Sequence, residues 1–226
     1  MKENLTNSLT NSILKKFLES PSSGLPKESK DKEYIVSQVG TPKSFCVGII
    51  DIIDSTKSVA SIPSNKTARY YEIYLNTMAK TVTQFNGYIL KTMGDSLLFY
   101  FPDTCYSDRK FGFLSCIECG FSLMNAHTKL NHELESEDLP RIDYRISFDY
   151  GVVTVMKTAE ESIDLVGPTI NTCAKINYLS PPNEIIIGND LYEKTKGFHE
   201  YKFKKAGNYT SDQKFSYPIY SVLRAN

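Results

Sequence analysis

Two apolar runs on either side of a glycine constrain the fold of this 226-residue chain more than any other feature. Residues 88–90 and 97–101 are rich in aromatic and bulky aliphatic side chains, and Gly94 and Asp95 lie between them. Apolar runs joined by a glycine-containing turn predict a tight β-hairpin. The chain is therefore expected to contain antiparallel strands, with an acid at the tip of one hairpin.

A second acid, Asp51, ends another apolar run over residues 45–50. A carboxylate beside apolar strands carries a desolvation cost unless a partner compensates it. Hard divalent cations such as Mg²⁺ prefer oxygen ligands, among them a few carboxylates. One such acid alone is better explained as part of an ordinary turn, but Asp51 and Asp95 at two strand ends together favour a metal site.

The overall composition is that of an ordinary soluble globular protein, with 41% hydrophobic and 23% charged residues. Lys and Arg (26) balance Asp and Glu (26), so there is no overall basic field to attract a nucleic acid. No apolar run approaches the ~18 residues of a membrane span, and the N-terminus lacks the apolar core of a signal peptide. We therefore expect a cytoplasmic protein that binds neither nucleic acid nor membrane.

The five cysteines are scattered in apolar contexts, which favours reduced, buried thiols. Cys116 and Cys119 form a CxxC pair, a pattern that can hold zinc or support redox chemistry. No second CxxC or paired histidine follows at metal spacing, and the surrounding residues predict a helix. The two thiols are therefore expected to face the core.

The polar residues 1–40 differ from the rest of the chain and are rich in Ser, Asn, Lys and Pro. Their pattern allows one amphipathic helix over residues 6–18, which the Pro- and Gly-containing stretch at 21–26 would end. We expect a linker or regulatory arm for an unknown regulator, or a partly disordered tail. Residues 41–226 are expected to form the folded domain.

Periodicity and turn signals predict an α+β fold for that domain. The expected elements are a strand at 44–51, a helix at 64–85 capped by Ser64, the hairpin at 88–101, a helix at 109–134, a strand at 143–149 that turns at Gly151 into 152–155, a helix at 168–179, a strand at 184–187, a helix at 190–196, and two strands within 200–224 separated by a polar loop at 208–214. The order is that of a ferredoxin-like βαββαβ core with a C-terminal αβ extension. With the hairpin in the middle of the sheet, the two acids are expected at adjacent strand ends.

Four motifs in this order resemble the catalytic domain of the class III nucleotidyl cyclases. They occupy residues 51–56, 91–95, 145–151 and 164–171. The resemblance covers about residues 44–224 and implies an adenylyl or guanylyl cyclase domain with active sites at a homodimer interface. The implied reaction is attack of the ribose 3′-hydroxyl of ATP on its α-phosphate, which yields 3′,5′-cyclic AMP and pyrophosphate.

The resemblance also implies a role for the two acids at the strand ends. Asp51 and Asp95 would bind two Mg²⁺ or Mn²⁺ ions, helped by the backbone carbonyl of Ile52. Arg145 would contact the phosphates from the same subunit. Two ions about 3.5–4 Å apart can stabilise both the attacking and the leaving oxygens of a phosphoryl displacement. The protein then needs mainly to position groups and to neutralise charge.

For the opposite subunit, the resemblance assigns base recognition to Lys91 and Asp164 and ribose orientation to Asn171. A lysine can donate to the ring N1 of adenine, and a carboxylate can accept from the exocyclic amine. Guanine presents a carbonyl and an N–H at those places. The pair therefore favours ATP over GTP.

Three positions depart from the family's pattern. Lys175 stands where the family usually has an arginine that stabilises phosphate charge in the transition state; lysine keeps the charge but loses the planar, bidentate donor. Pro168 stands where an acid is common. The family often has a phosphate-contacting lysine near the C-terminus, for which Lys204 or Lys205 is the candidate.

Two other functions stay open. The Lys175 replacement and the short N-terminal arm favour a catalytically weak or degenerate cyclase-homology domain that acts as a nucleotide-binding, regulatory module. A guanylyl cyclase is the weaker alternative, because Lys91 and Asp164 fit guanine less well. A P-loop ATPase is excluded, because the sequence has no glycine-rich loop that ends in Lys-Ser or Lys-Thr.

Overall fold

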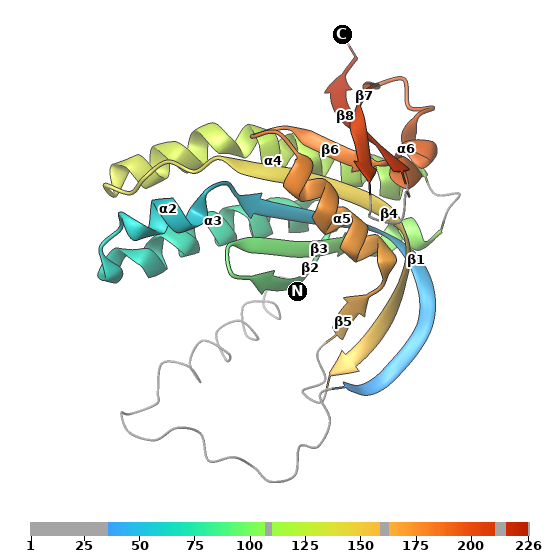
Figure 1. The fold of residues 1–226 in the computed structure, drawn as a ribbon, viewed down its shortest axis with the longest axis horizontal. Helices are drawn as coiled ribbons and strands as arrows, with labels where there is room; N and C mark the ends of the chain where they lie inside the picture. Colours follow the sequence, from blue (N-terminus) through green and yellow to red (C-terminus); the bar gives the residue numbers. More distant parts are fainter. Residues whose placement is uncertain (1–35, 107–109, 159–162, 211–215, 226) are drawn as a thin grey trace, which may run out of the picture. The chain divides into compact units, whose positions relative to one another are not determined.

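The computed structural model describes residues 36–106, 110–158, 163–210 and 216–225. Contacts divide the chain into Met1–Ile35 and Val36–Asn226, and the described residues all belong to the second unit. The helix expected over residues 6–18 and most of the loop expected at 208–214 lie outside them. Figure 1 shows the elements, which are β1 (Val36–Ile52), α2 (Ser55–Ala60), α3 (Ser64–Gln84), β2 (Tyr88–Met93), β3 (Ser96–Phe101), η1 (Pro102–Cys105), α4 (Lys110–Ser136), β4 (Tyr144–Thr158), β5 (Ile163–Val166), α5 (Pro168–Leu179), β6 (Ile185–Gly188), α6 (Asn189–Thr195), β7 (Tyr201–Thr210) and β8 (Ser216–Arg224).

Within the described residues, eight strands form one sheet in the order β2-β3-β1-β4-β6-β8-β7, with β5 paired to β4 off that path. Neighbouring strands run antiparallel except β4 and β6, which run parallel. Helices α3 and α4 cover one face of the sheet, and α5 crosses the other (Figure 1). The predicted α+β class is confirmed. No helix in the described ranges is long and apolar enough to span a membrane.

The hairpin β2–β3 lies at one edge of this sheet, so its expected place in the middle is wrong. Only β3 pairs with β1, and β2 is left at the edge. Ile50 of β1 lies opposite Leu97 of β3, which brings Asp51 to the level of Ser96, the residue after Asp95. The ends of β1 and β3 that carry the two acids are therefore adjacent, although the hairpin lies at the edge of the sheet and not in the middle.

Strand β4 continues through Gly151, where the sequence pattern predicted a turn. Gly151 lies opposite Phe45 in the β1–β4 ladder. A Cβ at Gly151 would lie 2.6 Å from the hydroxyl of Thr169, so glycine here allows α5 to approach the sheet closely. The pairing of β1 with β4 continues back to Val36, so β1 is longer than expected. Strand β5, which also pairs with β4, was not expected.

Two helix starts differ from the sequence prediction. Pro63 is the N-cap of α3, Ser64 is its first residue, and no side chain caps the helix. The short helix α2 was not expected and begins after Asp54, whose backbone is left-handed (φ 51°). Both starts depend on backbone geometry and not on a capping side chain.

The larger core lies between the sheet and the helices α3 and α4. Tyr70 and Tyr74 of α3, Phe99 of β3 and Phe148 of β4 are among its largest fully buried side chains. The rings of Phe99 and Phe148 meet edge to face, with centroids 5.8 Å apart. This ring contact joins β3 to β4 within the core that lies beneath α3 and α4.

The cysteines are free thiols. Cys116 and Cys119 of α4 are fully buried, as expected for thiols that face the core. Burial raises the pKa of both groups, which keeps them neutral. Cys105 differs from the expectation because it is partly exposed.

Helix α5 is attached to the sheet by a buried polar contact that orients its exposed face. The side-chain amide of Asn177 donates to the carbonyl oxygens of Ile49 (3.0 Å) and Arg145 (3.3 Å). Because these carbonyls belong to the neighbouring strands β1 and β4, the end of α5 is placed across both. Asn171 and Lys175 are exposed on the same helix.

Candidate active site

Asp51 ends β1 beside the hairpin that carries Asp95. The hydroxyl of Ser96 donates a hydrogen bond to Asp51 Oδ1. Burial raises the pKa of the half-buried Asp51 carboxyl, and the charge of Asp95 raises it as well, while the Ser96 hydrogen bond and Arg145 lower it. The two carboxylates, called the acid pair below, thus lie within electrostatic reach of each other.

The acid pair suits a divalent cation, because a cation compensates two like charges in a partly buried place. Among the described residues, no group of three or more His, Cys, Asp or Glu side chains could hold a metal. Protein carboxylates would therefore supply only part of the coordination shell, as is usual for Mg²⁺ bound with waters and substrate phosphates. Ile52 has a buried side chain and can contribute only its backbone carbonyl.

Arg145 lies opposite Asp51 in the β1–β4 ladder. Its guanidinium carbon is 5.5 Å from the centre of the Tyr178 ring, so the side chain lies over the end of α5. Its Nε is buried and has no hydrogen-bond partner within the described part of the chain. An unused donor on a permanent cation next to the acid pair suits an anionic group such as a phosphate.

A second cluster joins β2 to β5. Lys91 Nζ lies 2.9 Å from Oδ1 and 2.7 Å from Oδ2 of Asp164. The N–H of Leu165 donates to Asp164 Oδ1 (2.8 Å) and orients the carboxylate. The Lys91 and Asp164 side chains are 42% and 23% exposed, so their ion pair adds little to stability. It does place a donor beside an acceptor at the surface, which recognition of a nucleobase requires.

Asn171 and Lys175 are four residues apart on α5 and therefore share one exposed face of the helix. Lys175 lines a cavity of about 570 Å³ between α5 and β7, together with Tyr178 and residues 208–210. The lining of the cavity therefore includes the Lys175 ammonium and the side chains of Tyr178 and Tyr209. Its position beside Lys175 is suited to part of an anionic ligand.

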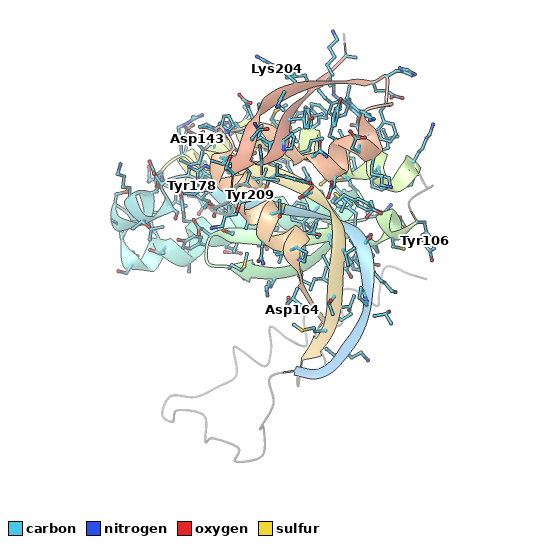
Figure 2. The ribbon with its side chains drawn as sticks, turned by 45° about the vertical axis from the view of Figure 1, so that its right-hand side comes forward. Tyr106, Asp143, Asp164, Tyr178, Lys204 and Tyr209 are labelled. Carbon is cyan, nitrogen blue, oxygen red and sulfur yellow. The ribbon has the colours of Figure 1, made fainter. Side chains whose placement is uncertain are left out.

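The two candidate lysines of β7 are not brought to this cavity. Among the described residues that line it, neither Lys204 nor Lys205 is present. Figure 2 shows Lys204 well away from Tyr209 and Tyr178, and it shows Asp164 on the other side of these tyrosines. Within one chain, the Lys91–Asp164 cluster is therefore separate from the end of α5 that carries Tyr178.

Comparisons with known proteins place this arrangement in a known fold. No protein-family model matches the sequence. The cytidylate cyclase of Staphylococcus aureus, a curated relative, is 26% identical over a 200-residue alignment that covers 78% of this chain and 47% of the relative. The chain thus spans about half the length of that relative. The solved adenylyl cyclase CyaB from P. aeruginosa superimposes with a TM-score of 0.72 and 19% identity, over 82% of this chain and 96% of that one.

This chain has the class III nucleotidyl cyclase fold. The guanylyl cyclase Cya2 matches with a TM-score of 0.72 and 21% identity, over 84% of this chain and 96% of that one. The guanylate cyclase domain of RhGC from Catenaria anguillulae, solved with GTP, matches at 0.71 and 17%, over 83% and 100%. The predicted resemblance and fold are confirmed. Because adenylyl and guanylyl cyclases both match, the class III fold alone does not identify the base.

Sequence reasoning missed two residues that contact the candidates in this cyclase fold. Ser96 binds Asp51, and Tyr178 packs against Arg145. A signal for each was present in the sequence. Ser96 follows Asp95 directly in the hairpin, and Tyr178 lies three residues after Lys175, a spacing that places both on one side of a helix.

Proposed function

We propose that this chain is a nucleotidyl cyclase that converts ATP to 3′,5′-cyclic AMP and pyrophosphate. The observation that carries the proposal is the partly buried acid pair with Arg145 beside it, whose buried Nε has no hydrogen-bond partner among the residues that the structure describes. In the reaction, the ribose 3′-oxygen bonds to the α-phosphorus and loses its proton, and the bond between that phosphorus and the oxygen that bridges to the β-phosphate breaks. Two Mg²⁺ or Mn²⁺ ions would supply Lewis-acid stabilisation of the attacking and leaving oxygens.

The chain's own residues would position the substrate and neutralise its charge. Asp51 and Asp95, with the carbonyl of Ile52, would hold the ions. Arg145 would donate to a phosphate from its Nε, which no group in the described ranges binds. From the other half of the site, Lys175 would stabilise the charge that develops on the phosphates.

Within one chain, the Lys91–Asp164 cluster is separate from the end of α5 where Arg145 packs on Tyr178 (Figure 2), and this separation supports a site shared by two copies. One copy would contribute the acid pair and Arg145. Its partner would contribute the Lys91–Asp164 cluster together with Asn171 and Lys175 of α5. A two-fold homodimer would then contain two identical sites at its interface.

The Lys91–Asp164 cluster supports a base that presents an exocyclic amine beside a ring-nitrogen acceptor. The ammonium can donate to the ring N1 of adenine, and the carboxylate can accept from the 6-amino group. Guanine and uracil present a carbonyl and a ring N–H instead. The short contacts between Nζ and both carboxylate oxygens hold the donor and the acceptor side by side.

CTP is a second candidate substrate. Cytosine presents a ring-nitrogen acceptor (N3) beside an exocyclic amine, the same pattern as adenine. Lys91 as a donor and Asp164 as an acceptor would therefore bind adenine and cytosine equally well, and they do not discriminate ATP from CTP. The 26% identity to the Staphylococcus aureus cytidylate cyclase favours this candidate. Cytosine has one ring and adenine two, so the space in front of the cluster would decide between them.

A panel of nucleoside triphosphates tests both candidates. The purified protein is incubated with Mn²⁺ and ATP, CTP, GTP or UTP, and cyclic nucleotide and pyrophosphate are quantified by mass spectrometry. We expect the highest kcat/KM with ATP, and no turnover of GTP or UTP above that of Asp51→Asn. A higher kcat/KM with CTP would select the second candidate. Absence of product from all four, with Mn²⁺ binding intact, would contradict the proposal and favour a regulatory nucleotide-binding module.

A further inference from the structure

Arg145 and Asp51 carry opposite charges and face each other, yet they form no ion pair. The two residues lie directly opposite in the β1–β4 ladder, so their side chains leave the sheet on the same face. Opposite charges in such positions commonly attract and pair. Within the part of the chain that the structure describes, the Arg145 side chain makes neither a hydrogen bond nor an ion pair. A different contact therefore holds the guanidinium.

Tyr178 provides that contact from α5. The guanidinium carbon of Arg145 lies over the Tyr178 ring, 5.5 Å from its centre, a distance at which the ring attracts a cation. The ring is 76% exposed, so burial in the core does not account for a tyrosine at this position. An aromatic ring attracts a guanidinium without accepting its N–H groups as a carboxylate would, so the donors stay available.

The backbone on both sides of this contact is fixed by Asn177, the residue before Tyr178. The buried side-chain amide of Asn177 donates to the carbonyl oxygens of Arg145 (3.3 Å) and Ile49 (3.0 Å). The end of α5 is thus joined to the same residue on which Tyr178 packs. The ring and the guanidinium therefore start from backbone positions that the fold keeps together.

We propose that Tyr178 is a positioning residue that keeps the Arg145 guanidinium apart from Asp51. Arg145 then stays available for a phosphate, and Asp51 stays available for a divalent cation. Without the ring, the guanidinium would pair with the Asp51 carboxylate, and each group would compete with the other's ligand. The inference rests on the roles proposed above for Arg145 and the acid pair.

Calorimetric titration of the full-length protein with inorganic tripolyphosphate in the presence of Mg²⁺ tests the inference in Tyr178→Ala. We expect the Kd for tripolyphosphate to rise about fivefold. Tyr178→Phe keeps the ring and should stay within about twofold of the wild type. Tyr88→Ala is the matched control, because Tyr88 is also an exposed tyrosine but packs against the ring of Tyr100. Its Kd should change less than about twofold.

A double-mutant cycle separates this role from a general effect on the site. If Tyr178 acts through Arg145, Tyr178→Ala has no further effect on the Kd in an Arg145→Ala background. An equal loss in both backgrounds would overturn the inference. A loss in Tyr178→Phe as large as that in Tyr178→Ala would overturn it as well, because it would assign the phosphate contact to the hydroxyl.

A crystal structure of ligand-free Tyr178→Ala provides a second measurement that needs no phosphate binding. We expect the Arg145 guanidinium within about 4 Å of the Asp51 carboxylate. A guanidinium that keeps its wild-type place would overturn the inference. A wild-type protein that binds no tripolyphosphate would instead contradict the phosphate site of the proposed function, so the two failures are distinguishable.

Discussion

Lys175 stands at the position where the class III pattern is expected to have an arginine. It is exposed on α5 and lines the cavity beside Tyr178. Lysine keeps the charge but cannot donate in the bidentate way of a guanidinium. One lost charge-assisted hydrogen bond raises a barrier by roughly 1.5–3 kcal/mol, or about ten- to a hundredfold in rate.

Lys175→Arg is therefore expected to raise kcat by about tenfold or more with little change in KM, because the gain concerns charge that develops in the transition state. Steady-state kinetics with Mn²⁺ and ATP provide the measurement. Lys175→Ala is the comparison variant and should be slower than the wild type. If all three proteins turn over equally fast, residue 175 does not face the phosphates.

At the scale of single residues, what the sequence could predict depended on how local the signal was. Asp51 and Asp95 could be located because each lies next to an apolar run, and the register of β1 with β3 brings Asp51 to the level of Ser96, the residue after Asp95. The placement of Asp51 opposite Arg145 could not be predicted, because the register of β1 with β4 depends on packing between distant segments of the chain.

At the scale of elements, a buried hydrogen bond attaches β8 to β4 across the end of β6. The hydroxyl of Tyr217 and the N–H of Tyr150 both donate to Asp149 Oδ1, each at 2.9 Å. A Cβ on Gly188 of β6 would lie 2.3 Å from that oxygen, so glycine leaves room for the contact. Burial raises the pKa of Asp149 to about 7, and the charge of Asp190 raises it too, against the lowering effect of the two hydrogen bonds.

The contribution of Asp149 to the free energy of unfolding should fall as the pH rises. The pKa of Asp149 is higher in the folded state than in the unfolded chain, so the folded state keeps the proton longer. The contribution is complete below about pH 4 and is lost as the pH rises through about 7. At ~1.4 kcal/mol per pKa unit, the loss is on the order of 4 kcal/mol.

Asp149→Asn keeps an acceptor oxygen for Tyr217 and should remove this pH dependence. Urea unfolding between pH 4.5 and pH 8 measures the free energy of unfolding of both proteins. Asp143→Asn is the control, because Asp143 is exposed and a hydrogen bond from Asn183 lowers its pKa, which gives the opposite sign. If the free energy of unfolding declines equally with pH in the wild type and in Asp149→Asn, the role given to Asp149 is wrong.

The elements that the sequence predicted well are those with a strong local period. Helices α3, α4 and α5 and the hairpin β2–β3 all lie near their expected ranges. The continuous β4 was missed because Gly151 has the chemistry of a turn residue, while its real role is the close approach of Thr169. Strand β5 was missed because four residues carry little pattern of their own, and it forms by pairing with β4.

At the scale of the whole molecule, the surface on and beside α5 exposes several large apolar side chains. Tyr178 is 76% exposed, and Leu179, Val152, Ile163 and Val166 are exposed large apolar residues as well. Exposed large apolar side chains are typical of a surface that another protein covers. The second copy proposed above would cover this surface.

Mixing two inactive variants tests this shared site most directly. Asp51→Asn disables the acid pair, and Asn171→Ala disables the α5 half, so each variant alone should have only background activity. When the two are mixed and allowed to exchange, half of the dimers are mixed and one of their two sites is intact. We predict that the mixture recovers about a quarter of wild-type cyclic nucleotide production. A mixture that stays at background, although both variants are folded and exchange subunits, would contradict a site built from two copies.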